Sequence, residues 1–181
     1  MIDKNLTLFL DFDGVLHPLS DFQGSTPSPY LGPYFIYTPI LIDLLRPYLD
    51  NMDIVISSAW GYSYSLNEMK DFLPKTWADR VVDAVYPHLP YIDDYRYKTG
   101  CATRWAEIAW YREHIRHDIG EHWLAIDDDN IGWPAHATNH LAHCEQSLDY
   151  TGTQPALMNA LLIYKEANIE DRHIVSRESK E

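Results

Sequence analysis

The sequence has few basic residues for its length of 181. It contains 14 Lys and Arg against 27 Asp and Glu, which gives a formal net charge of −13 at pH 7. A surface with this excess of negative charge repels polyanions. We therefore do not expect duplex nucleic acid or an anionic membrane as a general partner. A local basic pocket is still compatible with this charge, because the net charge does not describe a single cleft.

Cysteine and long apolar runs are also scarce. The two cysteines, Cys101 and Cys144, allow one disulfide at most, so a disulfide-stapled secreted domain is not indicated. The first apolar run, 6–10, breaks at Asp11, and no window approaches the roughly twenty apolar residues of a membrane-spanning helix. We expect a cytoplasmic protein without a membrane partner. The composition indicates no particular oligomeric state.

The length and the apolar content predict one globular domain. Apolar residues make up 46 % of the chain, which is typical of a folded protein, and we expect the domain to span 1–168. The charged segment 169–181 is expected to be a tail. Four prolines and two glycines fall between 16 and 38, so this segment is predicted to be a small cap or lid loop rather than a helix or a central strand.

Short apolar segments that favour strands alternate with segments of helical periodicity. The alternation predicts a three-layer, Rossmann-like α/β fold, with a central parallel sheet and helices on both faces. The predicted strands cover 6–10, 52–56, 80–86, 123–126 and 138–143, and the predicted helices cover 39–49, 67–73, 101–117 and 154–167.

Polar side chains follow three of the predicted strands directly. In parallel α/β sheets, ligands bind at the carboxyl ends of the strands. We therefore expect these side chains to meet in one site. They are Asp11 and Asp13, Ser57 and Ser58, and Asp127 and Asp128.

The segment Asp11-Phe12-Asp13-Gly14 places two carboxylates just past the first strand. Both can reach one site if the chain turns there, and Gly14 permits such a turn. Like charges brought together in a protein interior need a cation or a proton to balance them. Asp127 from another strand end favours the cation, and oxygen ligands favour Mg²⁺ over zinc. A solvated acidic loop is the simpler alternative.

In these motifs the chain resembles the haloacid dehalogenase-like (HAD) phosphohydrolase superfamily. The segment 8–16 around the two aspartates looks like the first motif of that superfamily. The apolar strand 54–57, which ends in a serine, is similar to the second motif. Lys98 stands where the lysine of the third motif is expected, and 125–128, with its paired aspartates, resembles the fourth motif.

The resemblance implies a mechanism that can be assigned residue by residue. Asp11 would attack phosphorus and become an aspartyl-phosphate, and Asp13 would serve as general acid and then as general base. The Asp11 carboxylate, the Asp13 backbone carbonyl and Asp127 would bind Mg²⁺. Ser57 and Lys98 would contact the phosphoryl group.

Several of these roles have alternatives. Ser58 can share the role of Ser57, and Arg96 and Arg104 lie near Lys98 in the sequence. Gly14 and Asp128 are expected beside the substrate or next to the metal ligands, where Asp128 would hold a metal-bound water.

Within the superfamily, the segment 57–60 (Ser-Ser-Ala-Trp) and the Thr151-Gly152 step resemble a small subgroup that is also found in RNA-repair fusion proteins. Relatives in that subgroup often have an arginine directly after the tryptophan. This chain has Gly61 at that position.

Several histidines have no place in this scheme. His136, His140 and Cys144 would share one face of a helix and could bind zinc there, whereas in a strand His143 would point away from His140 and Cys144. We expect ordinary polar packing for this group. His17 follows the first motif and is expected either at the entrance of the site or in a solvated loop.

The leading functional hypothesis is a Mg²⁺-dependent phosphatase acting on a small-molecule or nucleotide phosphomonoester. Asp13 favours phosphate chemistry, because a phosphate ester needs a proton on its leaving oxygen. A phosphotransferase or mutase of the same fold is an alternative within the enzyme class. A catalytically silent module that binds phosphate or a partner is the alternative from another class.

Overall fold

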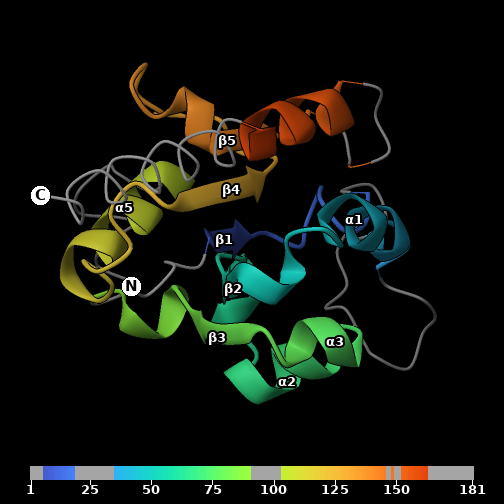
Figure 1. The fold of residues 1–181 in the computed structure, drawn as a ribbon. Helices are drawn as coiled ribbons and strands as arrows, with labels where there is room; N and C mark the ends of the chain where they lie inside the picture. The colour runs from blue at the N-terminus through green and yellow to red at the C-terminus, as the bar shows by residue number, and fades with distance from the viewer. Residues whose placement is uncertain (1–5, 19–34, 91–102, 146–147, 149–151, 163–181) are drawn as a thin grey trace, which may run out of the picture.

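A five-stranded parallel sheet forms the centre of the protein, in the strand order β3-β2-β1-β4-β5 (Figure 1). The computed structural model describes residues 6–18, 35–90, 103–145, 148 and 152–162. The strands are β1 (Leu6–Leu10), β2 (Met52–Ile56), β3 (Val81–Ala84), β4 (Trp123–Asp127) and β5 (Leu141–His143). This topology confirms the predicted three-layer, Rossmann-like α/β fold.

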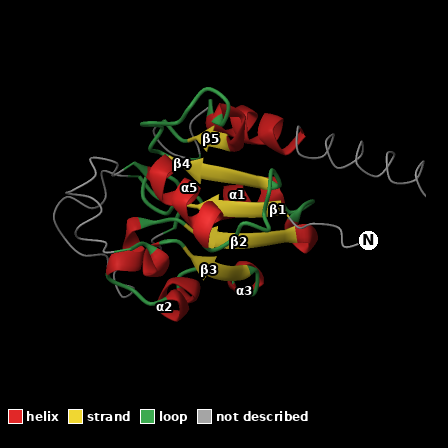
Figure 2. Cartoon of the chain, turned by 90° about the vertical axis from the view of Figure 1, so that its left-hand side faces the viewer, coloured by secondary structure: helices red, strands yellow, loops and turns green. Residues whose placement is uncertain are grey.

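Helices cover both faces of the sheet. Figure 2 shows α5 in front of the strands and α1 behind them. Side chains of α1, α2, α3 and the helix 153–162 join the core on the α1 side, and α5 forms the core on the other side. Besides the helix 153–162, the described residues form the helices α1 (Thr38–Leu45), α2 (Leu66–Asp71), α3 (Lys75–Ala78) and α5 (Arg104–His114).

Alternation along β1 explains how one short strand serves both cores. Leu8 and Leu10 point to the α1 side, whereas Phe9 points to the α5 side. Phe9 makes edge-to-face contacts with Tyr111 and Trp123, each with ring centroids 5.9 Å apart. Because both faces are covered, every residue of β1 is buried, as expected for the middle strand of a parallel sheet.

The predicted element boundaries need some corrections. The helix predicted over 39–49 ends at Leu45, and a 3₁₀ turn follows at Leu49–Asn51. Of the strand predicted over 138–143, only Leu141–His143 pairs with β4, because Thr138–His140 forms a 3₁₀ turn. The short helix α3 was not predicted; it begins directly after Pro74, in a segment too short to show periodicity.

Four predicted segments lie partly or wholly outside the described residues. These are most of the lid loop 16–38, the ends 101–102 and 163–167 of two predicted helices, and the whole of the tail 169–181. No helix in the described part of the chain is long and apolar enough to cross a membrane.

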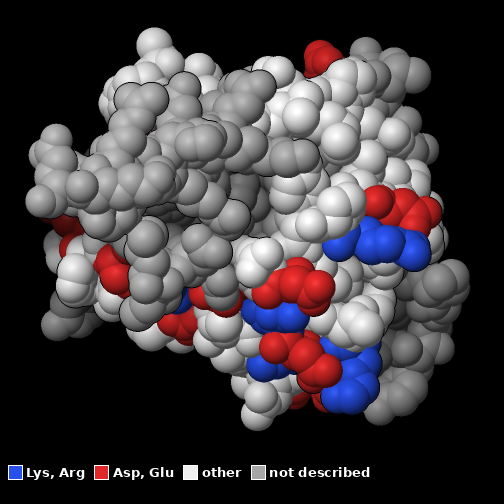
Figure 3. All heavy atoms as spheres, viewed as in Figure 1, with Lys and Arg blue, Asp and Glu red and all other residues white. Residues whose placement is uncertain are grey.

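The Lys and Arg side chains on the face seen in Figure 3 lie against acidic side chains. Lys75 contacts Asp79 at 3.1 Å, and Arg80 contacts Asp50 at 3.2 Å. Exposed pairs of this kind add little stability. They do mean that the basic groups on this face are balanced by neighbouring acids, in line with the excess of negative charge in the sequence.

Candidate active site

The site lies at the carboxyl ends of the three central strands. The backbone N–H of Asp11 donates to Ile126 O at 3.1 Å, and the N–H of Ser57 donates to Leu10 O at 2.9 Å. These ladder bonds continue past the last paired residues, so the first polar residue after β1 lies level with the ends of β2 and β4. Sheet register alone therefore places Asp11 between Ser57 and Asp127.

Three carboxylates converge at this point: Asp11, Asp127 and Asp128 each offer an oxygen, and these oxygens lie within 4.8 Å of one another. Asp11 and Asp127 are buried, with exposures of 2 % and 0 %. Burial raises the pKa of Asp11, and burial together with the charge of Asp11 raises the pKa of Asp127. The same two causes raise the pKa of Asp128 to about 7. A metal ion would relieve this repulsion, and oxygen ligands suit a hard cation.

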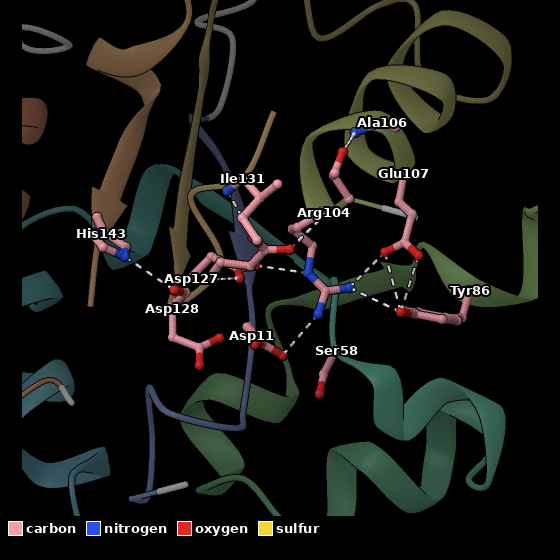
Figure 4. A network of polar contacts seen from close by, with 12 residues as sticks. Asp11, Ser58, Tyr86, Arg104, Ala106, Glu107, Asp127, Asp128, Ile131 and His143 are labelled. Carbon is pink, nitrogen blue, oxygen red and sulfur yellow. Dashed lines mark hydrogen bonds and ion pairs between the residues drawn. The ribbon is translucent and has the colours of Figure 1, made fainter. Parts of the chain in front are cut away.

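Arg104, the first residue of α5, enters the cluster from the α5 side of the sheet (Figure 4). Its Nε donates to Asp127 Oδ2 at 2.8 Å, and its Nη2 lies 3.5 Å from Asp11 Oδ1. Burial opposes the charge of this guanidinium, but the neighbouring carboxylates outweigh it and raise the pKa of Arg104 above its usual value. Arg104 is therefore a fixed positive charge beside Asp11.

Two buried side chains hold the far end of this guanidinium. Arg104 Nη1 donates to Glu107 Oε2 at 2.8 Å and to the Tyr86 hydroxyl oxygen at 3.2 Å. The Tyr86 hydroxyl in turn donates to Glu107 at 3.2–3.3 Å. Thr103 caps the start of α5 by accepting from Ala106 N at 3.3 Å. The cap and the two braces together fix the direction of the arginine.

Asp13 lies in different surroundings from Asp11. Its side chain is 32 % exposed. The Trp60 indole donates to its Oδ1 at 3.0 Å, and His17 Nε2 lies 3.0 Å from the same oxygen. The charge of Asp13 contributes to the raised pKa of Asp11.

Gly14 provides the turn that the sequence predicted. Its φ is +68°, a conformation that side chains disfavour. A Cβ at this position would lie 2.6 Å from Asp128 Oδ2. Gly14 therefore lets the first motif pass directly against the third carboxylate.

Ser57 and Ser58 occupy the end of β2 and are both fully buried. The Ser58 side chain hydrogen-bonds to Asp11 and lowers the pKa of that carboxyl, against the larger effect of burial. It also accepts from Trp60 N at 3.4 Å. The Ser57 hydroxyl has no hydrogen-bond partner in the described part of the chain, so it is an unsatisfied group at the site.

Lys98, the predicted third-motif cation, lies outside the described residues, as does Arg96. Arg104 is the basic residue that the structure places against Asp11 and Asp127. In α5, Trp105 and Ala109 are partly buried. The buried face carries Arg104, Glu107, Ile108 and Tyr111.

The histidines near the C-terminal end of the sheet do not come together. His140 stacks on Trp123, with centroids 4.3 Å apart, and contacts Trp123 O at 2.9 Å. His136 packs edge-on against Trp105, and His143 contacts Asp128 O at 3.1 Å. Within the described residues, the metal-ligand cluster is the three aspartates, and burial raises the pKa of Cys144.

The strand ends and the glycine turn lie where the first, second and fourth sequence motifs fall. A family model described as the HAD domain in Swiss Army Knife RNA repair proteins matches residues 7–151, from the first strand to beyond the last. The chain belongs to this HAD family. Searches of the curated proteins and of the solved structures found no match. Membership of the HAD family indicates phosphohydrolase-type chemistry, and the carboxylate cluster is able to bind a metal.

Gly61 packs closely against Tyr86. A Cβ at Gly61 would lie 2.7 Å from the Cβ of Tyr86. Tyr86 in turn holds Arg104. An arginine at position 61 would therefore displace the residue that orients the buried cation, which gives a physical reason for glycine here.

Proposed function

We propose that this protein is a Mg²⁺-dependent phosphate-ester hydrolase that works through an aspartyl-phosphate at Asp11. The observation that carries the proposal is the burial of Asp11 beside two further carboxylates, Asp127 and Asp128, and one fixed cation, Arg104. This arrangement supports a desolvated nucleophile whose charged form is favoured by the neighbouring arginine.

The charges around Arg104 support a bound Mg²⁺. Asp11, Asp127 and Glu107 contact this single guanidinium, and Asp128 completes the carboxylate trio. The carboxylates of the trio, together with the Asp13 backbone carbonyl, would hold the ion. When bound, Mg²⁺ neutralises these carboxylates and polarises the phosphoryl oxygens.

The reaction would proceed in two displacements. In the first, an Asp11 oxygen bonds to phosphorus as the ester P–O bond breaks, and the leaving oxygen takes a proton from Asp13. In the second, a water oxygen bonds to phosphorus, its proton passes to Asp13, and the bond between Asp11 and phosphorus breaks to release inorganic phosphate. Arg104 and the unsatisfied Ser57 hydroxyl would contact the phosphoryl oxygens.

We further propose that the phosphate is carried by a nucleotide or by an RNA end. The support is the RNA-repair description of the family. The net charge of −13 favours recognition of the terminal phosphate and the few groups beside it over recognition of a long backbone.

Hydrolysis of p-nitrophenyl phosphate tests the reaction class, measured with Mg²⁺ and with EDTA for the native chain and for Asp11→Asn. We expect turnover with Mg²⁺, background release with EDTA, and background release from Asp11→Asn under both conditions. Asp79→Asn is the matched control, because Asp79 is an exposed carboxylate whose partner is Lys75, and it should retain native activity.

Nucleoside monophosphates and short RNAs with a 5′- or 3′-terminal phosphate then test the substrate class. Turnover of these above that of a sugar phosphate supports the proposal. Equal activity of Asp11→Asn and the native chain would contradict the nucleophile assignment. Transfer of phosphate to an added alcohol in preference to water would favour a phosphotransferase.

A further inference from the structure

Two side chains converge on one oxygen of Asp13. The Trp60 Nε1 donates to Oδ1 at 3.0 Å, across 47 residues of sequence, and His17 Nε2 lies 3.0 Å from the same atom. Because both contacts fall on Oδ1, Oδ2 is the oxygen that remains for a substrate. The Asp13 side chain is 32 % exposed, whereas the His17 side chain is 1 % exposed.

Both partners of Asp13 are held by packing, so they act as fixed points. Trp60 is 6 % exposed and has aromatic contacts with Phe12 and Phe72, at centroid distances of 5.5 and 5.2 Å. The His17 ring stacks on Phe35 at 5.9 Å with an interplanar angle of 7°. Immobile neighbours restrict the movement of the carboxylate that they contact, and Trp60 Nε1 donates a hydrogen bond to it.

The second ring nitrogen of His17 has its own contact. Nδ1 lies 3.1 Å from the Pro18 carbonyl oxygen, which can only accept, so Nδ1 carries a proton. This bond fixes the ring orientation and leaves Nε2 3.0 Å from Asp13 Oδ1, where it can donate only when the imidazole carries both protons. Asp13 and His17 also form an isolated bridge between their backbones. The turn around Gly14 thus folds the first motif back on itself and brings His17 to Asp13.

We propose that His17 and Trp60 are positioning residues that hold Asp13 Oδ1, so that Oδ2 faces the leaving oxygen. The inference rests on the proposed hydrolase function and deepens it. As the ester P–O bond breaks, the proton moves from Oδ2 to the leaving oxygen, and in the second displacement Oδ2 takes a proton from water. His17 and Trp60 touch neither the substrate nor phosphorus.

The dependence on the leaving group separates this role from a purely structural one. Nitrophenolate leaves without a proton, whereas an alkoxide needs one. The ratio kcat/KM reports the steps up to the first bond cleavage, so it isolates the proton donation by Asp13. We compare kcat/KM for p-nitrophenyl phosphate and for an alkyl phosphomonoester such as glycerol phosphate.

Trp60→Phe keeps most of the aromatic packing but removes the N–H donor, and His17→Phe keeps the stacked ring but removes both nitrogens. We expect each to lower kcat/KM for the alkyl ester by about tenfold or more, within the range of about 10²–10⁴ that general acid catalysis contributes. The value for the nitrophenyl ester should change by less than about twofold, since that leaving group does not use the acid.

Matched controls remove the same groups elsewhere. Trp77→Phe removes a buried indole whose Nε1 has no hydrogen-bond partner among the described residues. His140→Phe removes a ring that stacks on Trp123 and whose Nδ1 contacts a backbone carbonyl, as in His17. Both controls should leave the ratio between the two substrates at its native value.

Each result has a distinct meaning. Equal losses on both substrates, in variants that melt like the native chain, would overturn the positioning role and leave the hydrolase function standing. A native chain that hydrolyses neither ester would overturn the proposed function, and the role of Asp13 with it. If one variant does not fold, the other decides between these outcomes.

Discussion

Asp11 and Asp13 are separated by one residue, yet the protein surrounds them in opposite ways. Asp11 is 2 % exposed and lies among carboxylates and a buried arginine. The side chain of Asp13 is 32 % exposed and contacts the ring nitrogens of Trp60 and His17. A nucleophile benefits from loss of water and a nearby cation, whereas an acid/base must exchange protons with substrate and water. The difference in surroundings matches the difference in proposed roles.

The sharpest way to break this comparison is to make the same substitution at both positions. Asp11→Asn should abolish turnover, because no phosphoryl acceptor remains. Asp13→Asn should still release nitrophenolate from p-nitrophenyl phosphate in a burst of about one equivalent per chain, then stall, because the intermediate lacks a base for its hydrolysis. Rapid-mixing measurement of nitrophenolate distinguishes the two. A burst from Asp11→Asn would contradict the assignment.

A second test concerns Arg104, the cation that lies beside Asp11 and Asp127. Arg104→Met leaves Asp127 and Glu107 without their buried partner, and such losses cost about 3–5 kcal/mol. We expect a fall of this size in the free energy of unfolding, measured with urea in EDTA. Arg104→Lys keeps a charge but loses the planar fork and should fall in between.

The matched control for this charge is Arg80→Met. Arg80 makes its ion pair with an Asp50 side chain that is 98 % exposed, so the expected change is within about 1 kcal/mol. Similar losses for the two arginines would show that burial of the Arg104 cluster has no energetic consequence.

The sequence predicts the central part of this site for a simple geometric reason. Asp11 and Ser57 follow strands directly, Asp127 is the last residue of β4, and parallel register brings strand ends together. Arg104 was only one of several basic candidates, because a charge at the start of a helix normally faces water. Its burial depends on partners that are far away in sequence, above all Tyr86.

The contact between Trp60 and Asp13 was equally hidden from the sequence. The tryptophan is recognisable in the segment 57–60, but the 3₁₀ turn at Ala59–Tyr62 decides where its N–H points. The buried face of α5 includes Arg104 and Glu107, and apolar patterning does not predict buried charged residues. Local sequence pattern predicts the strands and their ends. Tertiary packing determines which charged side chains lie between those ends.

A third test uses pH to probe the carboxylates on the Asp11 side. Burial, and then the charge of Asp11, raise the pKa of Asp128 from 3.8 to about 7. Between these values the folded chain keeps a proton that the unfolded chain has lost, so stability falls as pH rises. In EDTA we expect the free energy of unfolding to fall across this window, and less steeply for Asp128→Asn.

Mg²⁺ should reverse that trend, because the metal binds deprotonated carboxylates. The stabilisation by Mg²⁺ is therefore expected to increase from pH 5 to pH 8, as followed by thermal melting. Asp79→Asn, at an exposed carboxylate, should keep the native pH profile. If the stability of the native chain in EDTA does not change with pH, the folded carboxylate cluster does not bind a proton that the unfolded chain has lost.

The smallest expected effect comes from a substitution at Gly14, in the turn that follows Asp11 and Asp13. Gly14→Ala puts a side chain at a φ of +68° and places its Cβ 2.6 Å from Asp128 Oδ2. The left-handed conformation costs about 1–2 kcal/mol, and the contact must also move Asp128. Gly120→Ala, at a φ of +59°, carries the conformational cost without the contact with Asp128. We therefore expect both variants to lose stability, but only Gly14→Ala to bind Mg²⁺ more weakly. The measurement is the concentration of Mg²⁺ at which the rise in melting temperature is half complete. Equal Mg²⁺ dependence in the two variants would mean that Asp128 can move without cost, and the carboxylate would then have no fixed place among the metal ligands.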